Sequence, residues 1–179
     1  MHPPSSLPIR LATVLGFAVL MAIGARLSAP MVPVPMTMQT WAVLLAGVVL
    51  GSRWGVAAAL LYLGLALAGL PVLSDGAAGP EPFTGPTAGY LIAFPLTAGL
   101  AGVLAERGRL RRVVPATVWL FGLHLGVLAL GTAWLAGPLG VPAAVAAGFT
   151  PFLVGAAVKS LLVVLAARAL AAVPGLRRG

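Results

Sequence analysis

The sequence predicts an all-α integral membrane protein, a six-transmembrane-helix bundle with both termini in the cytoplasm. Three observations favour this fold class. First, 60% of the 179 residues are hydrophobic and only 8% are charged, whereas roughly 25% are charged in a typical soluble domain. Second, several charge-free stretches have the length of about 20 residues that a helix needs to cross a bilayer. Third, the basic residues are distributed between these stretches as the positive-inside rule requires.

Six apolar segments account for the whole chain, residues 1–179, as a single membrane domain. The second is short because it follows the proline-rich segment MVPVPMTMQT. The uncharged interval from Val113 to Val158 is long enough for two crossings, and the sequence GPLGVP at 137–142 separates them. The predicted spans cover approximately residues 9–28, 40–52, 54–73, 86–105, 113–135 and 143–171.

The basic residues support six crossings independently of hydropathy, because arginine and lysine are retained on the cytoplasmic side. Six crossings place the loops at 29–39, 71–85 and 136–142 outside. Arg26 is the exception, and we expect its side chain to extend towards the headgroups. The net charge of +8 therefore reflects topology, and we expect no nucleic-acid partner. The basic residues on the cytoplasmic side are Arg10, Arg53, Arg107, Arg109, Arg111, Arg112, Arg168, Arg177 and Arg178.

The sequence lacks the motifs of familiar enzymes. It contains no cysteine, which excludes disulfides, thiolate metal sites and cysteine nucleophiles. It also contains no GxxxxGK[ST] phosphate loop, no HExxH zinc motif and no GxSxG elbow. We therefore expect no catalytic residue, no metal and no cofactor. The sequence therefore contains no energy source of its own for transport.

Lys159 is the most informative single residue, because it lies within an apolar run from about 152 to 167. An ionised amine at mid-bilayer costs roughly 2.5–3.5 kcal/mol, so such a residue normally faces a cavity or a partner. The candidate partners are Asp75 from an outer loop and an anionic ligand. His124 can relay a proton or bond a ligand, but a neutral, satisfied interior histidine is the more ordinary interpretation.

Two outer loops concentrate the polar side chains of this apolar chain. The segment PVPMTMQTW holds its backbone extended with prolines, and the segment SDGAAGPEPFTGPTAGY is rich in glycine. Together they predict a lid over a ligand pocket, although each is also compatible with a stiff connection. Trp41, near the outer mouth, can anchor at the headgroups or stack on a ligand. The candidate residues are Thr37, Gln39, Thr40 and Trp41 in the first segment and Asp75, Thr84, Thr87 and Tyr90 in the second.

Four motifs in order, PVPMTMQTWAVLLAG, GLPVLSDGAAG, GPTAGYLIAFP and PFLVGAAVKS, resemble the BioY family. These are the biotin-specific S components of energy-coupling-factor (ECF) vitamin transporters. The resemblance covers roughly residues 10–170. It implies a multi-pass protein of a bacterial or archaeal cell membrane that binds biotin from outside. It also implies partners: a transmembrane T component and two ATP-binding subunits.

The resemblance also implies roles for individual residues. Lys159 matches the lysine of the family's last helix and is expected to bond an oxygen of biotin. Ala18 and Ala22, four apart on the first helix, are similar to the family's docking surface for the coupling module. The full set of substrate-binding candidates is Lys159, Asp75, Gln39, Thr40, Trp41, Thr87 and Tyr90.

One motif departs from the family pattern. Many members resemble PFLPGD before the lysine, whereas this chain has Val154 and Ala156 at the proline and aspartate positions. Either Asp75 replaces the missing carboxylate or the ligand differs from biotin. We hypothesise the first, so that Asp75→Ala weakens ligand binding far more than Glu81→Ala. Two other functions stay open: a stand-alone secondary transporter or facilitator for a small organic anion, and a membrane enzyme that uses His124.

Overall fold

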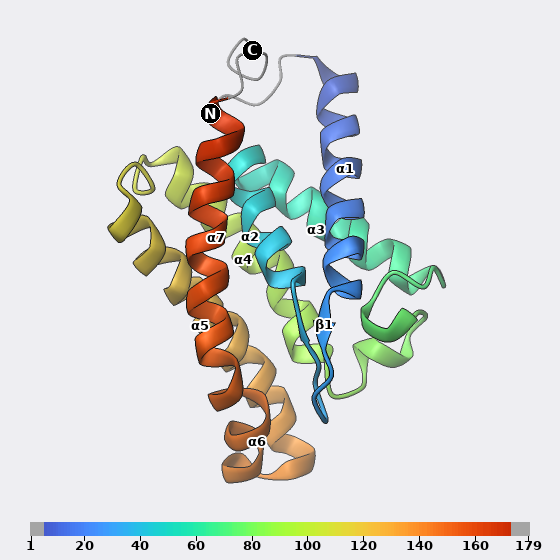
Figure 1. Cartoon of the computed structure of the whole chain (residues 1–179). Coiled ribbons are helices and arrows are strands. Elements are labelled where there is room, and N and C mark those ends of the chain that lie inside the picture. The colour runs from blue at the N-terminus through green and yellow to red at the C-terminus, as the bar shows by residue number, and fades with distance from the viewer. Residues whose placement is uncertain (1–5, 173–179) are drawn as a thin grey trace.

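The computed structural model describes residues 6–172, which form an all-helical body with one short β-hairpin (Figure 1). Arg177 and Arg178 lie outside the described residues. The α-helices are α1 (Leu7–Arg26), α2 (Gln39–Leu50), α3 (Ser52–Leu67), α4 (Ala88–Glu106), α5 (Val113–Leu139), α6 (Val141–Gly148) and α7 (Leu153–Ala172). The strands are β1 (Ser28–Ala29) and β2 (Met36–Thr37), and short 3-10 helices are η1 (Ser74–Gly76), η2 (Glu81–Phe83) and η3 (Thr150–Phe152).

Four helical segments of the described chain are long and apolar enough to cross a membrane: α1, α4, α5 and the combined α6–α7 stretch Val141–Ala172. The apolar helices α2 and α3 are shorter, with 12 and 16 residues. The protein is therefore helical with several candidate spans, and the count of six depends on counting α2 and α3. The start of α1 and the end of α7 lie at the same end of the molecule (Figure 1). That these ends face the cytoplasm stays a prediction.

Two predicted spans have different bounds in the structure. The segment predicted at 143–171 is divided into α6 and α7, with η3 between them. Pro151 lies in this turn, and proline has no backbone N–H to donate to a continuous helix. The segment predicted at 54–73 ends as a helix at Leu67. Gly69 then adopts a φ of +94°, which terminates the helix, and Pro71 follows two residues later.

Small residues let α2 and α3 approach α4, the most buried of the long helices. Within an apolar stretch of 18 residues, 56% of the residues of α4 are buried, whereas the corresponding share in α1 is 22%. A Cβ at Gly47 would collide with the carbonyl oxygen of Ala98, and one at Gly102 would collide with the backbone of Ser52. In lipid, such close backbone contacts supply much of the association between helices. The Glu106 carboxylate fastens the junction by accepting hydrogen bonds from the Ser52 amide and hydroxyl.

The proline-rich segment after α1 forms a hairpin that positions the start of α2. Ser28 pairs with Thr37 and Ala29 pairs with Met36 in an antiparallel arrangement. The Met38 amide then donates to the carbonyl oxygens of Gly24 and Leu27 at the end of α1, at 3.0 and 3.1 Å. These bonds hold the backbone of Thr37 and Gln39 against the helix bundle.

The structure places Ala18 inside the bundle and not on its surface. Its side chain is 1% exposed and packs in the main hydrophobic core. Ala22 is half-buried at the edge of this core. Direct contact of Ala18 with another subunit is therefore not available in this structure, because α1 turns the opposite face outward. That face carries Leu11, Ala12, Leu15, Gly16, Val19 and Ile23, all exposed.

Candidate ligand-binding cavity

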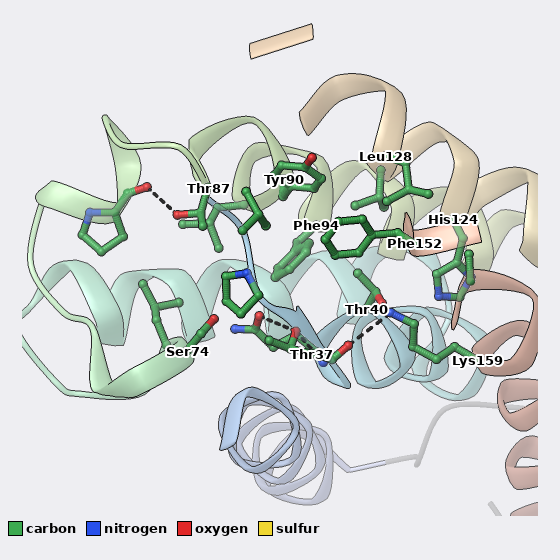
Figure 2. A pocket seen from close by; sticks show the side chains of 18 of the residues that line it. Thr37, Thr40, Ser74, Thr87, Tyr90, Phe94, His124, Leu128, Phe152 and Lys159 are labelled. Carbon is green, nitrogen blue, oxygen red and sulfur yellow. Dashed lines mark hydrogen bonds between the residues drawn. The ribbon is translucent and has the colours of Figure 1, made fainter. Parts of the chain in front are cut away.

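A cavity of about 140 Å³ lies among α2, α4, α5, α7 and the two loops that the sequence marked as polar. Residues far apart in sequence meet here, because the hairpin and the loop between α3 and α4 both reach this cavity. Figure 2 shows Ser74 and Thr87 at one end of it and His124 and Lys159 at the other. The polar lining residues are Thr37, Gln39, Thr40, Ser74, Thr87, Tyr90, His124 and Lys159.

Lys159 reaches the cavity from α7 and is held by the hairpin segment. Its side chain is 8% exposed. The Nζ atom donates to the Thr37 carbonyl oxygen at 3.1 Å and to the Thr40 hydroxyl at 2.8 Å (Figure 2). An ammonium group has three N–H donors, so these bonds leave one for a ligand. Asp75, one of the two candidate partners considered from the sequence, does not take part in these hydrogen bonds.

A chain of buried hydrogen bonds fixes the amide of Gln39. The Thr37 hydroxyl donates to Gln39 Oε1 at 2.8 Å, and Gln39 Nε2 donates to the Tyr62 hydroxyl at 2.5 Å. The Tyr62 hydroxyl donates in turn to the Val72 carbonyl oxygen at 3.0 Å. Buried polar groups that are fully partnered hold one geometry. This series of hydrogen bonds therefore connects α2 to the loop after α3, whose residues Leu73 and Ser74 line the cavity.

The walls between the two polar ends are apolar. Phe94 of α4 and Phe152 of η3 lie between these ends (Figure 2), and Leu91, Val127 and Leu128 complete the apolar wall. Tyr90 contributes its ring, while its hydroxyl donates to the Gly148 carbonyl oxygen at 2.7 Å. Thr87 is likewise bonded within the chain, to the Pro82 carbonyl oxygen at 3.1 Å.

The structure brings together five of the seven predicted substrate-binding residues: Lys159, Gln39, Thr40, Thr87 and Tyr90 all line the cavity. The other two do not. Asp75 is exposed within η1 with a left-handed φ of 55°. Trp41 is half-buried and packs its ring against the hydrophobic core. The assignment of a ligand contact to either residue stays a prediction that this placement does not favour.

Several important residues were not singled out from the sequence. Phe94, Phe152 and Tyr62 sit in apolar runs, where an aromatic side chain gives no signal that distinguishes a cavity wall or a buried hydrogen bond from ordinary core. Ala156 does line the cavity and is 2% exposed. The signal there was the departure from the PFLPGD pattern, and the structure places this departure directly at the cavity.

The lining has a definite chemistry. In the part of the chain that the structure describes, the residues lining the cavity include one cationic side chain and no aspartate or glutamate. No group of three or more potential metal-binding side chains occurs in the described part of the chain. Apolar walls combined with a few fixed hydroxyl, amide and ammonium groups are typical of a small-molecule binding site. The arrangement suits a compact ligand with polar groups at both ends and an apolar middle.

Comparison with known proteins identifies relatives in sequence and one solved structure of similar fold. The probable biotin transporter BioY of Pyrococcus horikoshii is 38% identical over 154 residues, covering 86% of this chain and 91% of that protein. The biotin transporter BioY of Rhodobacter capsulatus is 40% identical over 153 residues, covering 77% of this chain and 79% of that protein. A 2.1 Å crystal structure of the S-component for biotin from an ECF-type ABC transporter matches with a TM-score of 0.81 and 28% identity, covering 90% of each chain.

The family-level match extends over nearly the whole sequence. The sequence profile of the BioY family matches residues 3–175, a range that includes the hairpin, the loop between α3 and α4, and the helix that carries Lys159. This match and the similarity to the two biotin transporters lead to one conclusion: the chain belongs to the BioY family.

Proposed function

We propose that this chain is the high-affinity biotin-binding membrane subunit, the S component, of an ECF-type vitamin uptake transporter. It works as a multi-pass protein of the cell membrane together with a T component and two ATP-binding subunits, which supply the energy. The observation that carries the proposal is the cavity of a BioY-family protein, with Lys159 held at its end by Thr37 and Thr40.

The chemistry of biotin supports this proposal. Biotin carries a ureido ring at one end, a carboxylate at the other and an apolar thioether ring and chain between them. The cavity has polar residues at two ends and the aromatic walls of Phe94 and Phe152 between them. The third N–H of Lys159 is available to an oxygen atom of the ligand. Relatives that cover most of this chain are named biotin transporters.

Equilibrium binding of radiolabelled biotin to the purified protein in detergent tests the proposal. We expect saturable binding at one site per chain with a nanomolar Kd, and competition by unlabelled biotin but not by unrelated small carboxylates. Folded protein that binds no biotin, or that binds every small carboxylate equally, contradicts the assignment.

The alternative function, a stand-alone facilitator or secondary transporter for a small organic anion, predicts a different result in liposomes. A facilitator takes up substrate without ATP, and a secondary transporter needs an ion gradient. We expect the isolated S component to bind biotin at the membrane, with sustained uptake only when the T component and the ATP-binding subunits are present. Rapid gradient-driven uptake by the chain alone supports the alternative.

We further propose that the exposed face of α1 docks the coupling module. Among the four long apolar segments described, α1 is the least buried: only 22% of its apolar 18-residue stretch lies inside the protein. The residue Gly16 is exposed on it, and nothing lies within 4 Å of a Cβ placed there. Large side chains at such a site would keep a partner helix away without disturbing this chain.

For Gly16→Trp we expect unchanged biotin binding but loss of co-purification with the T component. Ala22→Trp should act in the same direction with some cost in stability, because Ala22 is half-buried. Ala18→Trp is the contrasting variant. The Ala18 side chain is 1% exposed, so this substitution should lower both thermal stability and biotin binding. Recovery of the intact complex with Gly16→Trp would remove the docking assignment.

A further inference from the structure

His124 is placed at the cavity with one ring nitrogen fully engaged and the other without a protein partner. Its side chain is 2% exposed and lines the cavity at the same end as Lys159 (Figure 2). Nδ1 lies 3.2 Å from the Leu120 carbonyl oxygen and 2.9 Å from the Ser160 hydroxyl. Nε2 is buried and has no hydrogen-bond partner among the residues the structure describes.

The neighbours of Nδ1 determine which nitrogen carries the proton. The Ser160 hydroxyl has one proton, which it donates to the Ala156 carbonyl oxygen at 2.7 Å. Towards Nδ1, Ser160 can therefore only accept, and the Leu120 carbonyl oxygen can only accept as well. Two acceptors facing Nδ1 require an N–H at that position. In a neutral imidazole, Nε2 is then the acceptor, with its lone pair free.

A buried acceptor without a partner is unusual in a native protein, because nearly all buried polar groups are hydrogen-bonded. We infer that His124 Nε2 accepts a hydrogen bond from an N–H group of the ligand in this cavity. The inference deepens the proposed function and rests on it. In biotin the only N–H groups are those of the ureido ring, so the ureido ring lies at the end occupied by His124 and Lys159.

This placement explains how the site works without a carboxylate at position 156. Ala156 lines the same cavity, one helical turn before Ser160, and contributes no polar side chain there. His124 supplies the acceptor and Lys159 the donor, which together match the N–H and C=O edge of a cyclic urea. The carboxylate of biotin then extends towards Ser74 and Thr87 at the opposite end.

Two substitutions of His124 distinguish the role of Nδ1 from the role of Nε2. In His124→Asn the side-chain NH₂ can occupy the position of Nδ1 and keep the bonds to Leu120 and Ser160, but nothing replaces Nε2. In His124→Gln the amide reaches the position of Nε2 and can present its oxygen there. Thr117→Val, on the same helix but outside the cavity lining, is the matched control.

Binding of three ligands to each variant tests the inference: biotin, biotin methylated on the ureido nitrogens, and biotin amide, which is altered only at the carboxyl end. Wild type and Thr117→Val should bind the methylated analogue about tenfold or more weakly than biotin. His124→Asn should bind biotin about tenfold more weakly than wild type and lose this discrimination, while His124→Gln should retain part of it. The biotin amide should show the same ratio to biotin in all four proteins.

Two other outcomes contradict the inference and can be told apart. His124→Asn with wild-type affinity and wild-type discrimination overturns the inference while leaving biotin binding intact. A wild type that binds no biotin overturns the proposed function and this inference with it.

A second measurement does not depend on affinity. The sequence has 2 histidines, so a His2→Ala background leaves His124 as the single source of imidazole ¹⁵N signals. We expect Nδ1 to be protonated and Nε2 unprotonated in the free protein, and Nε2 to shift towards a hydrogen-bonded value when biotin is added. A protonated Nε2, or an Nε2 signal unchanged by saturating biotin, overturns the inference.

Discussion

Replacing Lys159 with methionine is expected to raise the Kd for biotin by roughly 10- to 150-fold. Methionine keeps most of the length of the side chain but has no N–H donor. A hydrogen bond from a charged group contributes about 1.5–3 kcal/mol, and each 1.4 kcal/mol is tenfold in affinity. Lys159 is the only cationic side chain in the lining of the cavity that the structure describes, so no neighbour can take its place.

The matched control is Arg168→Met, which removes an exposed cation from the same helix without touching the cavity. It should leave the Kd within about a factor of two of wild type, as expected for a surface group distant from the ligand. Thermal unfolding in detergent should show that both variants are folded. Equal losses of affinity in the two variants would mean that Lys159 acts through general charge and not through contact with the ligand.

Replacing Gly131 with alanine is expected to destabilise the protein and weaken biotin binding together. Gly131 on α5 faces Tyr90 on α4, and a Cβ at this position would collide with the Tyr90 ring. The ring cannot turn away freely, because its hydroxyl donates to Gly148. Overpacking of this kind costs about 1–3 kcal/mol. Because Tyr90 lines the cavity, displacement of its ring also changes the shape of the site.

Gly122→Ala is the matched control on the same helix. Gly122 is exposed, and nothing lies within 4 Å of a Cβ placed there. Alanine in a helix is favoured over glycine by up to about 1 kcal/mol, so this variant should be as stable as wild type or slightly more stable. Both are measured by unfolding in detergent, with and without biotin. A Gly131→Ala protein with wild-type stability and affinity would show that α4 and α5 are not packed as described.

The sequence predicted the helical membrane fold and most of the helix positions, because a bilayer imposes a strong rule on composition. Runs of apolar residues of sufficient length mark α1, α4 and α5 within a few residues of their observed bounds. Lys159 could be selected for the same reason, since a lone amine in an apolar run is costly without a partner. The order of motifs also placed the chain in its family.

The partners of these residues could not be predicted, because they depend on which helix faces meet. From the sequence, Lys159 had two candidate partners, Asp75 and an anionic ligand, whereas the structure provides Thr37 and Thr40, both brought there by the hairpin after α1. Likewise, two alanines four residues apart do not reveal which face of α1 turns inward. Packing buried Ala18, where the resemblance to the family implied a docking surface.

The sequence by itself determined that this is a helical membrane protein of the BioY type and drew attention to the lysine in its last helix, because hydropathy, charge and motif order are properties of the chain alone. Only the tertiary structure decided which groups surround the cavity and what each of them contacts. His124 is the clearest example. Its tautomer follows from Leu120 and from the bond between Ser160 and Ala156, contacts that exist only when α5 packs against α7.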